Sequence, residues 1–385
     1  MHLATYYNGV SIHRRDRTIF GKFLQPHLVL STCRAAGGIR RNIDYVLNHQ
    51  SCEPKNHHRN IDYRDVLDYR RMICENIGLA AEKCVTMGTA ANMHHAAIIH
   101  RTFLDLEVVA VVTGGVETNG GRAGDPASVL ESESGFKSLD ETGSDTIKPG
   151  TINTMLFISQ PLTEGAITRA IMTATEAKSA ALQELAVNSR YSDGLATGTG
   201  TDQIIVAAPD PDEKIYRLTG AGKHSKLGEL IGKSVICAVK ETLARQNSLT
   251  PSGQCSAKIH LERFGCTSDS MKEGICNHLN HEQTKILMDN FHTINRDPIV
   301  VAGVATMAHL RDKFSWHILP PSCWRETMSS SGAHLACSVG GRYEKMVDYR
   351  QQLATTISPQ PDNQGFLALC WSALARGFID KWWRQ

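Results

Sequence analysis

The hydrophobic positions in the first 250 residues fall into short runs typical of buried strands and longer stripes typical of helices. Short apolar runs predict strands over 28–31, 107–113, 151–158 and 203–208. Apolar residues at helical spacing predict helices over 64–76, 163–187 and 226–245. Thr163 is positioned to cap the second of these helices. Strands that alternate with helices predict an α/β class, with a mixed sheet and flanking helices.

The pattern changes after residue 250. The sequence Thr250-Pro251-Ser252-Gly253 is typical of a linker, and later stretches such as 282–292 and 298–312 have helical patterns. This region also holds six of the 11 cysteines and seven of the 17 histidines. We therefore expect an α/β domain over 1–250, followed by a mainly helical C-terminal region over 251–385.

The composition is that of an ordinary globular chain and gives no sign of a nucleic-acid or membrane partner. The 41% hydrophobic and 21% charged residues are ordinary for a globular chain. A net charge of +2 gives no electrostatic reason to expect nucleic acid or an anionic membrane surface as a partner. The longest apolar runs, such as 108–112, are far shorter than the roughly 20 residues that span a bilayer.

The amino-terminal residues and the spacing of the cysteines indicate where in the cell the protein is expected. The first residues lack the charged start and apolar core of a signal peptide. The cysteines are odd in number and scattered, with no CxxC pair, which is typical of reduced thiols. We expect a cytoplasmic protein.

A polar, glycine-rich segment over 113–126 directly follows the predicted strand at 107–113. Ligand sites of α/β sheets gather at such strand ends, and glycines let the backbone approach a ligand and expose N–H donors. Glu117 and Asp125 are candidate acid/base groups, and Arg122 could hold an anion or pair with one of them. The alternative is a glycine-rich loop with a structural Arg–Asp pair.

A second polar run, Thr197 to Asp202, alternates threonine with glycine before the strand at 203–208. Its small residues leave room for a substrate, and Asp202 stands at the strand entrance. An ordinary turn after a helix end is the alternative. Glu176 lies about 140° around the predicted helix from Ile171 on the apolar stripe. It is therefore either a site carboxylate or part of a solvated helix face that includes Lys178.

The histidines do not predict a metal. His94 and His95 would point about 100° apart on a helix. His278 and His281 have a spacing that permits shared ligation on one helix, but no partner cysteine or carboxylate is identifiable. The metal content stays unknown.

Gly150-Thr151 stands at the mouth of a predicted strand. It offers one further possibility, a threonine nucleophile released by self-cleavage.

Several motifs then occur in a fixed order. Asn42 is followed by MGTAANM at 87–93, VTGGVETNGGRAGDP at 112–126, PGTINTMLFI at 149–158, TATEAKSAALQEL at 173–185, TGTGTDQIIVAA at 197–208 and TGAGKHSKLGELIG at 219–232. Each motif is weak alone. Together, over most of residues 30–247, they resemble the adenosylcobinamide amidohydrolases of corrinoid salvage.

This resemblance implies hydrolysis of the amide that joins a propionyl side chain of the corrin ring to aminopropanol. The products would be adenosylcobyric acid and the amino alcohol, within cobalamin salvage. Such a reaction needs a base, donors for the oxyanion and an acid for the leaving amine. The candidate catalytic carboxylates are Glu117, Asp125, Glu176 and Asp202. Because no G-x-S-x-G elbow is present, activated water is favoured as the nucleophile.

The resemblance also implies a binding site for a substrate that displays many carboxamides. The residues expected to contact it are Asn42, Asn92, Asn119, Arg122, Thr151, Asn153, Gly198, Thr199, Gly200 and Thr201. A cobalt-containing corrinoid is the expected small-molecule partner, as substrate, and the sequence shows no required cofactor.

Other functions stay open. The chain could be a non-catalytic corrinoid or tetrapyrrole binder that takes a ligand from its His/Cys-rich tail, or a self-processed hydrolase. The tail over 251–385 could instead cap the substrate or form a homo-oligomer contact, with its cysteines buried as small hydrophobic residues.

Overall fold

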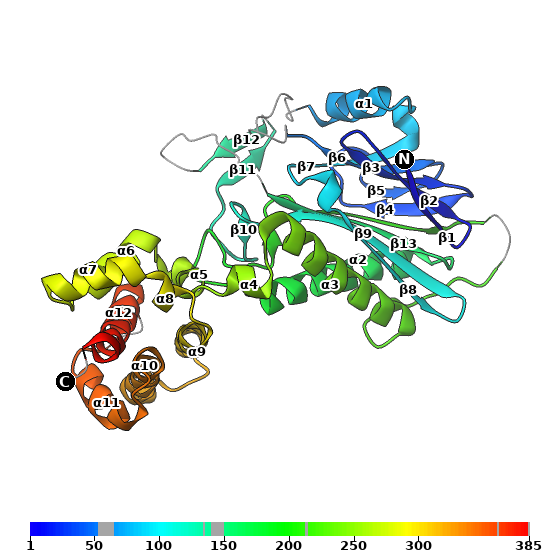
Figure 1. Ribbon diagram of the computed structural model, residues 1–385. Coiled ribbons are helices and arrows are strands. Elements are labelled where there is room, and N and C mark those ends of the chain that lie inside the picture. The colour runs from blue at the N-terminus through cyan, green and yellow to red at the C-terminus, as the bar shows by residue number, and fades with distance from the viewer. Residues whose placement is uncertain (53–64, 134, 140–149, 212–214, 360–361, 384–385) are drawn as a thin grey trace. The chain divides into compact units, whose positions relative to one another are not determined.

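The computed structural model describes residues 1–52, 65–133, 135–139, 150–211, 215–359 and 362–383. Their contacts divide the chain into two units, Met1–Leu249 and Thr250–Gln385 (Figure 1). Among the described residues, strands occur only in the first unit, and the second is helical. The predicted fold class, α/β followed by a mainly helical region, is confirmed. No helix in the described part of the chain is long and apolar enough to cross a membrane.

A mixed sheet with the order β5-β4-β15-β13-β9-β8 forms the centre of the first unit. It is antiparallel except for the parallel pair β13 and β15. Its strands are β4 (His27–Ser31), β5 (Gly38–Arg40), β8 (Ala97–Phe103), β9 (Leu106–Gly115), β13 (Thr151–Ile158) and β15 (Gln203–Pro209). The four strands predicted from apolar runs are therefore confirmed.

A second sheet, with the order β1-β2-β3-β6-β7, was not predicted. It is antiparallel except for the parallel pair β6 and β7. Its strands are β1 (His2–Tyr6), β2 (Val10–Arg15), β3 (Thr18–Phe23), β6 (Tyr45–Gln50) and β7 (Cys84–Thr89).

The two sheets pack face to face, and helices cover their outer faces (Figure 1). Along β13, Met155 and Phe157 face the second sheet, whereas Leu156 and Ile158 face α2 (Glu164–Glu184) and α3 (Lys226–Asn247). On the far side, α1 (Val66–Asn76) packs on the outer face of the second sheet. This four-layer arrangement explains the continuous apolar run over residues 155–158 of β13, since both faces of the strand are buried.

Shorter elements complete the first unit. Thr163 caps α2 as predicted, with its hydroxyl accepting from the Ala166 N–H at 3.2 Å. The remaining elements are η1 (Ala81–Lys83), η2 (Met93–His95), β10 (Gly120–Gly121), β11 (Val129–Ser132), β12 (Gly135–Ser138) and β14 (Gly198–Thr199). The segment between β9 and β13 includes the hairpin β11–β12 and a strand, β10, that pairs with β14. Residues 140–149 of this segment lie outside the described residues.

The second unit has a helical core of its own. Its helices are α4 (Pro251–Gln254), α5 (Ala257–Leu261), η3 (Glu262–Phe264), α6 (Ser268–Cys276), α7 (His281–Asn290), α8 (His292–Asn295), α9 (Pro298–Ser315), η4 (Pro321–Cys323), α10 (Trp324–Gly340), η5 (Tyr343–Lys345), α11 (Met346–Ala354) and α12 (Asn363–Trp382). Cys266, Cys337 and Cys370 are buried in this core among apolar side chains.

The stretch expected as a linker stands at the division between the two units, and it begins a short helix, because Thr250 caps α4 and Pro251 occupies its first turn. One local expectation for this unit was wrong. His278 lies in the turn between α6 and α7, so it does not share one helix with His281.

Two histidines of the first unit are buried in the neutral form. Burial lowers the pKa of His27 to about 4 and that of His49 to about 4. The Nδ1 of His27 donates to the Gln25 carbonyl at 2.8 Å, so its Nε2 accepts from the Tyr7 hydroxyl at 3.2 Å. The Nδ1 of His49 lies 2.8 Å from the Tyr69 hydroxyl.

These two pKa values predict how stability depends on pH. Because both lie below the ordinary value of about 6.5, the unfolded chain binds these protons first as the pH falls. The free energy of unfolding should be at its full value above about pH 6.5 and should decrease towards about pH 4, by about 3 kcal/mol for each histidine. Urea unfolding followed by circular dichroism across this range measures the slope. His49→Gln should reduce the slope, whereas His94→Gln at an exposed position should not. An unchanged slope in His49→Gln would contradict the assignment.

The second unit contains a buried ion pair. Arg263 donates through Nη1 and Nη2 to the two carboxylate oxygens of Asp312, at 2.8 and 2.5 Å, and both side chains are 5% exposed. The guanidinium carbon also lies 4.2 Å from the centre of the Phe264 ring.

Removal of one partner should leave an uncompensated buried charge. We expect Asp312→Ala to lower the free energy of unfolding by about 3–5 kcal/mol in denaturant titrations of the full chain. The double variant Arg263→Met/Asp312→Leu should recover most of this loss, and Glu282→Ala at an exposed position serves as the control. A loss below about 1 kcal/mol, the range of a surface pair, would show that the pair is not buried in solution.

Candidate active site

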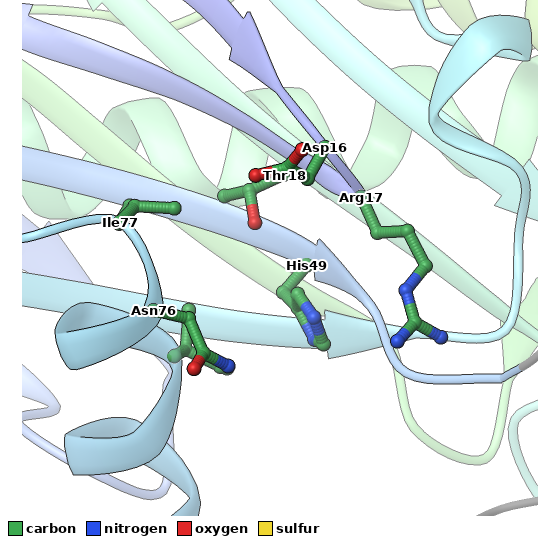
Figure 2. Close-up of a pocket in the computed structure, with 7 residues that line it drawn as sticks. Asp16, Arg17, Thr18, His49, Asn76 and Ile77 are labelled. Atoms are coloured by element: carbon green, nitrogen blue, oxygen red, sulfur yellow. The ribbon is translucent and has the colours of Figure 1, made fainter.

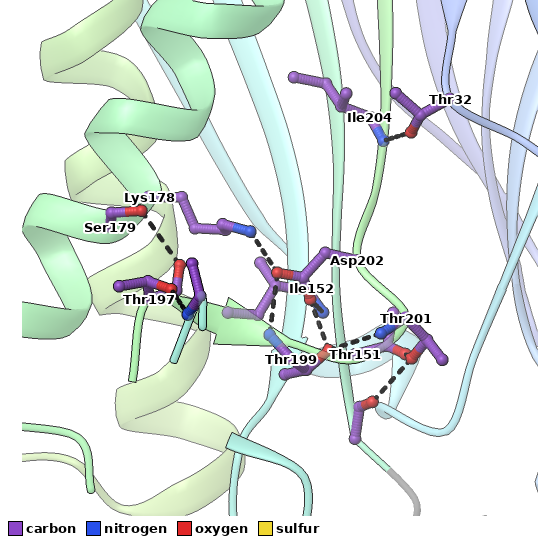
Figure 3. Close-up of polar contacts among 12 residues, drawn as sticks. Thr32, Thr151, Ile152, Lys178, Ser179, Thr197, Thr199, Thr201, Asp202 and Ile204 are labelled. Carbon is purple, nitrogen blue, oxygen red and sulfur yellow. Dashed lines mark hydrogen bonds and ion pairs between the residues drawn. The ribbon is translucent and has the colours of Figure 1, made fainter. Parts of the chain in front are cut away.

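The starts of β13 and β15 bring two threonine-rich segments together at one edge of the central sheet. Thr151 begins β13, and Asp202 directly precedes β15. The Oδ1 of Asp202 accepts from the backbone N–H of Ile152 at 2.8 Å, which ties the two strand starts together (Figure 3). The carboxyl end of β9 lies at the same edge, because Gly115 pairs with Thr151 in the antiparallel ladder.

Asp202 is the centre of this arrangement. Besides Ile152, it accepts from the Thr199 hydroxyl at 2.6 Å, from the Thr199 N–H at 3.0 Å and from the Lys178 ammonium (Figure 3). The Asp202 and Lys178 side chains are each 14% exposed. Since both oxygens are engaged by donors, this carboxylate has little capacity left to take a proton from water.

Position 198 requires glycine, because it lies beside the Lys178–Asp202 ion pair. A Cβ at Gly198 would lie 2.5 Å from Asp202 Oδ2 and 2.7 Å from Lys178 Nζ. Gly198 also pairs with Gly121 across β14 and β10, so the 113–126 segment is joined to the 197–202 run. The two polar segments predicted separately therefore form one structure.

A second cluster surrounds the carbonyl oxygen of Gly150. It accepts from Asn119 Nδ2 and from the Thr201 hydroxyl, both at 3.0 Å. Because a threonine hydroxyl has one hydrogen and Thr201 donates it to Gly150, the contact between the Thr151 and Thr201 hydroxyls must be donated by Thr151. The Tyr191 hydroxyl donates to Asn119 Oδ1 at 2.7 Å and orients that amide.

A buried polar network lies deeper between the two sheets. Asn153 is fully buried, and its Nδ2 donates to Asn48 Oδ1 and to the Gly88 carbonyl, both at 3.0 Å. Asn48 in turn donates to the Thr113 hydroxyl at 2.7 Å. This network connects β13, β6, β7 and β9 and holds the sheets in register below the threonine cluster. Sequence patterns did not identify Asn48 as part of the site, and they included Thr113 only as the first residue of the glycine-rich segment.

Asp125 holds the glycine-rich loop in place. Burial raises the pKa of Asp125, but hydrogen bonds from Ser189, Ser192 and the Arg122 backbone outweigh it, so the net pKa lies below its ordinary value. The Ser189 hydroxyl and the Arg122 N–H donate to Oδ2 at 2.6 and 2.7 Å. The Arg122 guanidinium donates instead to the Leu195 carbonyl at 3.3 Å.

The two predicted glutamates lie outside the threonine cluster. Glu117 is exposed to solvent on its loop. Glu176 is exposed on α2 and forms an ion pair with Lys223 at 2.8 Å. The residue of α2 that pairs with Asp202 is Lys178, which the sequence analysis considered only as part of a solvated face. The missed signal is its position on the apolar stripe between Ala174 and Ala181, where an unpaired charge would be costly.

Two predicted asparagines also have other roles. Asn42 is exposed and precedes β6, with a φ of 60°. Asn92 caps η2, with its side chain accepting from the His94 N–H at 2.9 Å. Of the predicted set, the structure therefore brings together Asn119, Thr151, Asn153, Asp202 and the segment 198–201.

A cleft of about 290 Å³ lies elsewhere in the first unit (Figure 2). It is lined by Asp16, Arg17, Thr18, His49, Ile73, Asn76 and Ile77. Residues His49 and Asn48 point to opposite faces of β6, so the cleft lies on the α1 side of the second sheet, away from Asp202. Within the described parts of both units, no group of three or more His, Cys, Asp or Glu side chains could hold a metal ion.

Comparison with known proteins identifies the family. The adenosylcobinamide amidohydrolase family matches residues 3–251, a range that includes both threonine-rich segments. An uncharacterized protein of Methanocaldococcus jannaschii is 34% identical over 239 residues, which are 60% of this chain and 88% of that protein. Residues 252–385 lie outside the family match. The resemblance inferred from the motifs is confirmed, and the chain belongs to the adenosylcobinamide amidohydrolase family.

Proposed function

We propose that this protein hydrolyses adenosylcobinamide at the amide that joins the corrin side chain to aminopropanol, as a step of cobalamin salvage. The observation that carries the proposal is the family match over residues 3–251. It is supported by a cluster of hydroxyl and amide groups where β9, β13 and β15 meet. The corrinoid is the substrate, and the proposal requires no cofactor.

The cluster offers groups of the kind that such a substrate needs. A corrinoid presents carboxamides around its ring, and these pair with side chains that both donate and accept. Asn119, Thr151 and Thr201 are such groups at the edge of the sheet. A donor that is aimed at the developing oxyanion typically contributes about 3 kcal/mol of transition-state stabilisation. Thr201 of this cluster is exposed to solvent and therefore open to a ligand.

The carboxylates of the site act in positioning rather than as general bases. Asp202 is engaged by four donors, and Asp125 is held by Ser189 and the Arg122 backbone. We therefore place Asp202 as a positioning residue that fixes Thr199 and the start of β13. Lys178 balances its charge in a partly buried site.

The first test of the proposal is the reaction itself. Purified full-length protein incubated with adenosylcobinamide should release aminopropanol and adenosylcobyric acid, detected by mass spectrometry and liquid chromatography. Heat-denatured protein serves as the control. A protein that shifts the visible spectrum of cobinamide yet releases no amine would be a binder and would overturn the proposal.

The second test concerns the Lys178–Asp202 pair. Asp202→Ala should lower kcat about 100-fold, because loss of the anchor displaces the start of β13 from the substrate. Lys178→Met should have an effect in the same direction, with KM changed much less than kcat. Lys240→Met, which breaks an exposed ion pair with Glu184, is the matched control and should keep the wild-type kcat. Thermal melting verifies that each variant is folded.

A different pattern of activity would contradict this role. If Asp202→Ala keeps its kcat while Glu176→Gln loses activity, the exposed glutamate is the functional carboxylate and the positioning role of Asp202 is wrong.

A further inference from the structure

The proposed site contains hydroxyl groups that could attack an amide, but its carboxylates do not supply their base. Asp202 and Asp125 are engaged by donors, and Glu176 is paired with Lys223 at the surface. Glu117 is exposed, and its carboxylate forms no hydrogen bond with the described residues. A hydroxyl nucleophile is weak unless a base activates it. Activation of a hydroxyl in this site must therefore come from another group.

The peptide bond before Thr151 has the groups that such activation requires. The Gly150 carbonyl oxygen already accepts from two side chains, Asn119 Nδ2 and Thr201 Oγ1, both at 3.0 Å. Two donors on one carbonyl oxygen are the arrangement that stabilises an oxyanion. The hydroxyl of the next residue, Thr151, donates to the same Thr201 hydroxyl (Figure 3). Nucleophile, proton carrier and carbonyl oxygen are thus joined by consecutive hydrogen bonds.

The backbone at this bond is also closely held. Gly150 has a φ of 151°, and a Cβ there would lie 2.8 Å from Asn119 Cβ and 3.1 Å from the Gly115 carbonyl oxygen. Only glycine lets the Asn119 amide approach its carbonyl in this way. On the other side of the bond, Thr151 is 6% exposed and paired in the β13–β9 ladder. The described residues on both sides of the bond are therefore closely packed.

We propose that the Gly150–Thr151 peptide bond cleaves itself and leaves Thr151 as a new amino terminus. The Thr151 Oγ1 attacks the Gly150 carbonyl carbon and forms a C–O bond. Its proton passes to Thr201 Oγ1, while the Thr201 proton passes to the Gly150 oxygen, which Asn119 also stabilises. This relay moves protons without separating charge.

The next steps complete the balance of atoms. The C–N bond breaks, and the Thr151 nitrogen takes the proton carried by the former carbonyl oxygen. An ester now joins Gly150 to Thr151 Oγ1, and the Thr151 amine is free. One water hydrolyses this ester, which gives the Gly150 carboxylate and restores the Thr151 hydroxyl. The net change is the addition of one water, and no oxidant or cofactor takes part.

Cleavage would supply the missing base for amide hydrolysis, an assignment that rests on the proposed function. An α-amino group has a pKa of about 7.7–8.0, so a fraction is neutral near neutral pH and can take the proton of the adjacent hydroxyl. Thr151 would then be the nucleophile in place of water, and its own amine the base.

Intact mass measurement of the full-length protein tests the cleavage directly. We expect the full-length mass to be replaced over time by two fragments, 1–150 and 151–385, whose masses sum to that of the chain plus one water. Amino-terminal sequencing of the second fragment should begin Thr-Ile-Asn. Hydroxylamine should accelerate cleavage and leave a hydroxamate on Gly150, because it attacks the ester.

Variants at Thr151 and Thr201 distinguish a loss of the cleavage reaction from a loss of the fold. Thr151→Ser keeps a hydroxyl and should still cleave, whereas Thr151→Val should remain intact. Thr201→Val should slow cleavage about 100-fold, in the range of a lost oxyanion donor. Thr168→Val, at an exposed position on α2, is the matched control and should cleave as the wild type does. Circular dichroism shows whether each intact variant is folded.

The outcomes distinguish this inference from the proposed function. A wild-type chain that stays at full-length mass while it hydrolyses adenosylcobinamide would overturn self-cleavage alone. A cleaved chain that releases no aminopropanol would overturn the proposed reaction and leave the cleavage in place. Cleavage in Thr151→Val at the wild-type rate would show that a contaminating protease, rather than Thr151, cuts the chain.

Discussion

The carboxylate of Asp202 is the interaction on which the geometry of the site depends. β13 and β15 are parallel, so their amino ends meet at one edge of the sheet only after the chain has crossed over through α2. A hydrogen bond from the Ile152 N–H to Asp202 joins these ends, beside the contacts of Thr201 with Thr151 and Gly150. The same carboxylate orders Thr199, and β14 then pairs with β10 and brings the glycine-rich loop to this edge. Segments far apart in the sequence are in this way placed within hydrogen-bond distance of one another.

The free-energy cost of partly burying the Asp202 carboxylate explains which residues surround it. A partly buried carboxylate needs a cation and donors, and a pair such as Lys178–Asp202 contributes more to a defined geometry than to stability. Lys178 must therefore come from the buried stripe of α2, and Gly198 must lack a side chain to let the pair close. The Asn153–Asn48–Thr113 network lies between the sheets, where the side-chain nitrogens of Asn153 and Asn48 donate to buried acceptors, while the Asn153 Oδ1 has no hydrogen-bond partner among the described residues. The floor of the site is thus held by polar contacts as well as by apolar packing.

The hydrophobic pattern was sufficient for the strands that are buried on both faces and for the helices with a continuous apolar stripe. β13, β15, α2 and α3 were predicted because each carries a strong apolar run or stripe. The second sheet was not, since β1 is partly exposed along its length and β2 and β3 mix apolar with charged residues. For the site, the Thr/Gly run before β15 pointed to Asp202, and the family resemblance implied Asn119 and Thr151, but neither could rank the carboxylates. Whether a carboxylate can act as a base depends on which donors reach its oxygens. Those donors come from residues distant in sequence, such as Lys178 and Ser189.

The burial of Thr151 also favours one of two routes for the proton of its hydroxyl, which are transfer to a carboxylate base and relay through the Thr201 hydroxyl. A carboxylate base beside a hydroxyl that is 6% exposed would have to leave its own donors, and charge would separate in a medium that solvates it poorly. A relay through the Thr201 hydroxyl keeps every group neutral and uses hydrogen bonds that already exist. A carbonyl with two donors is ordinary by itself, since its oxygen has two lone pairs. What sets Gly150 apart is that one of its donors is itself bonded to the hydroxyl of the following residue, so that attack and proton return take place within one closed ring of contacts.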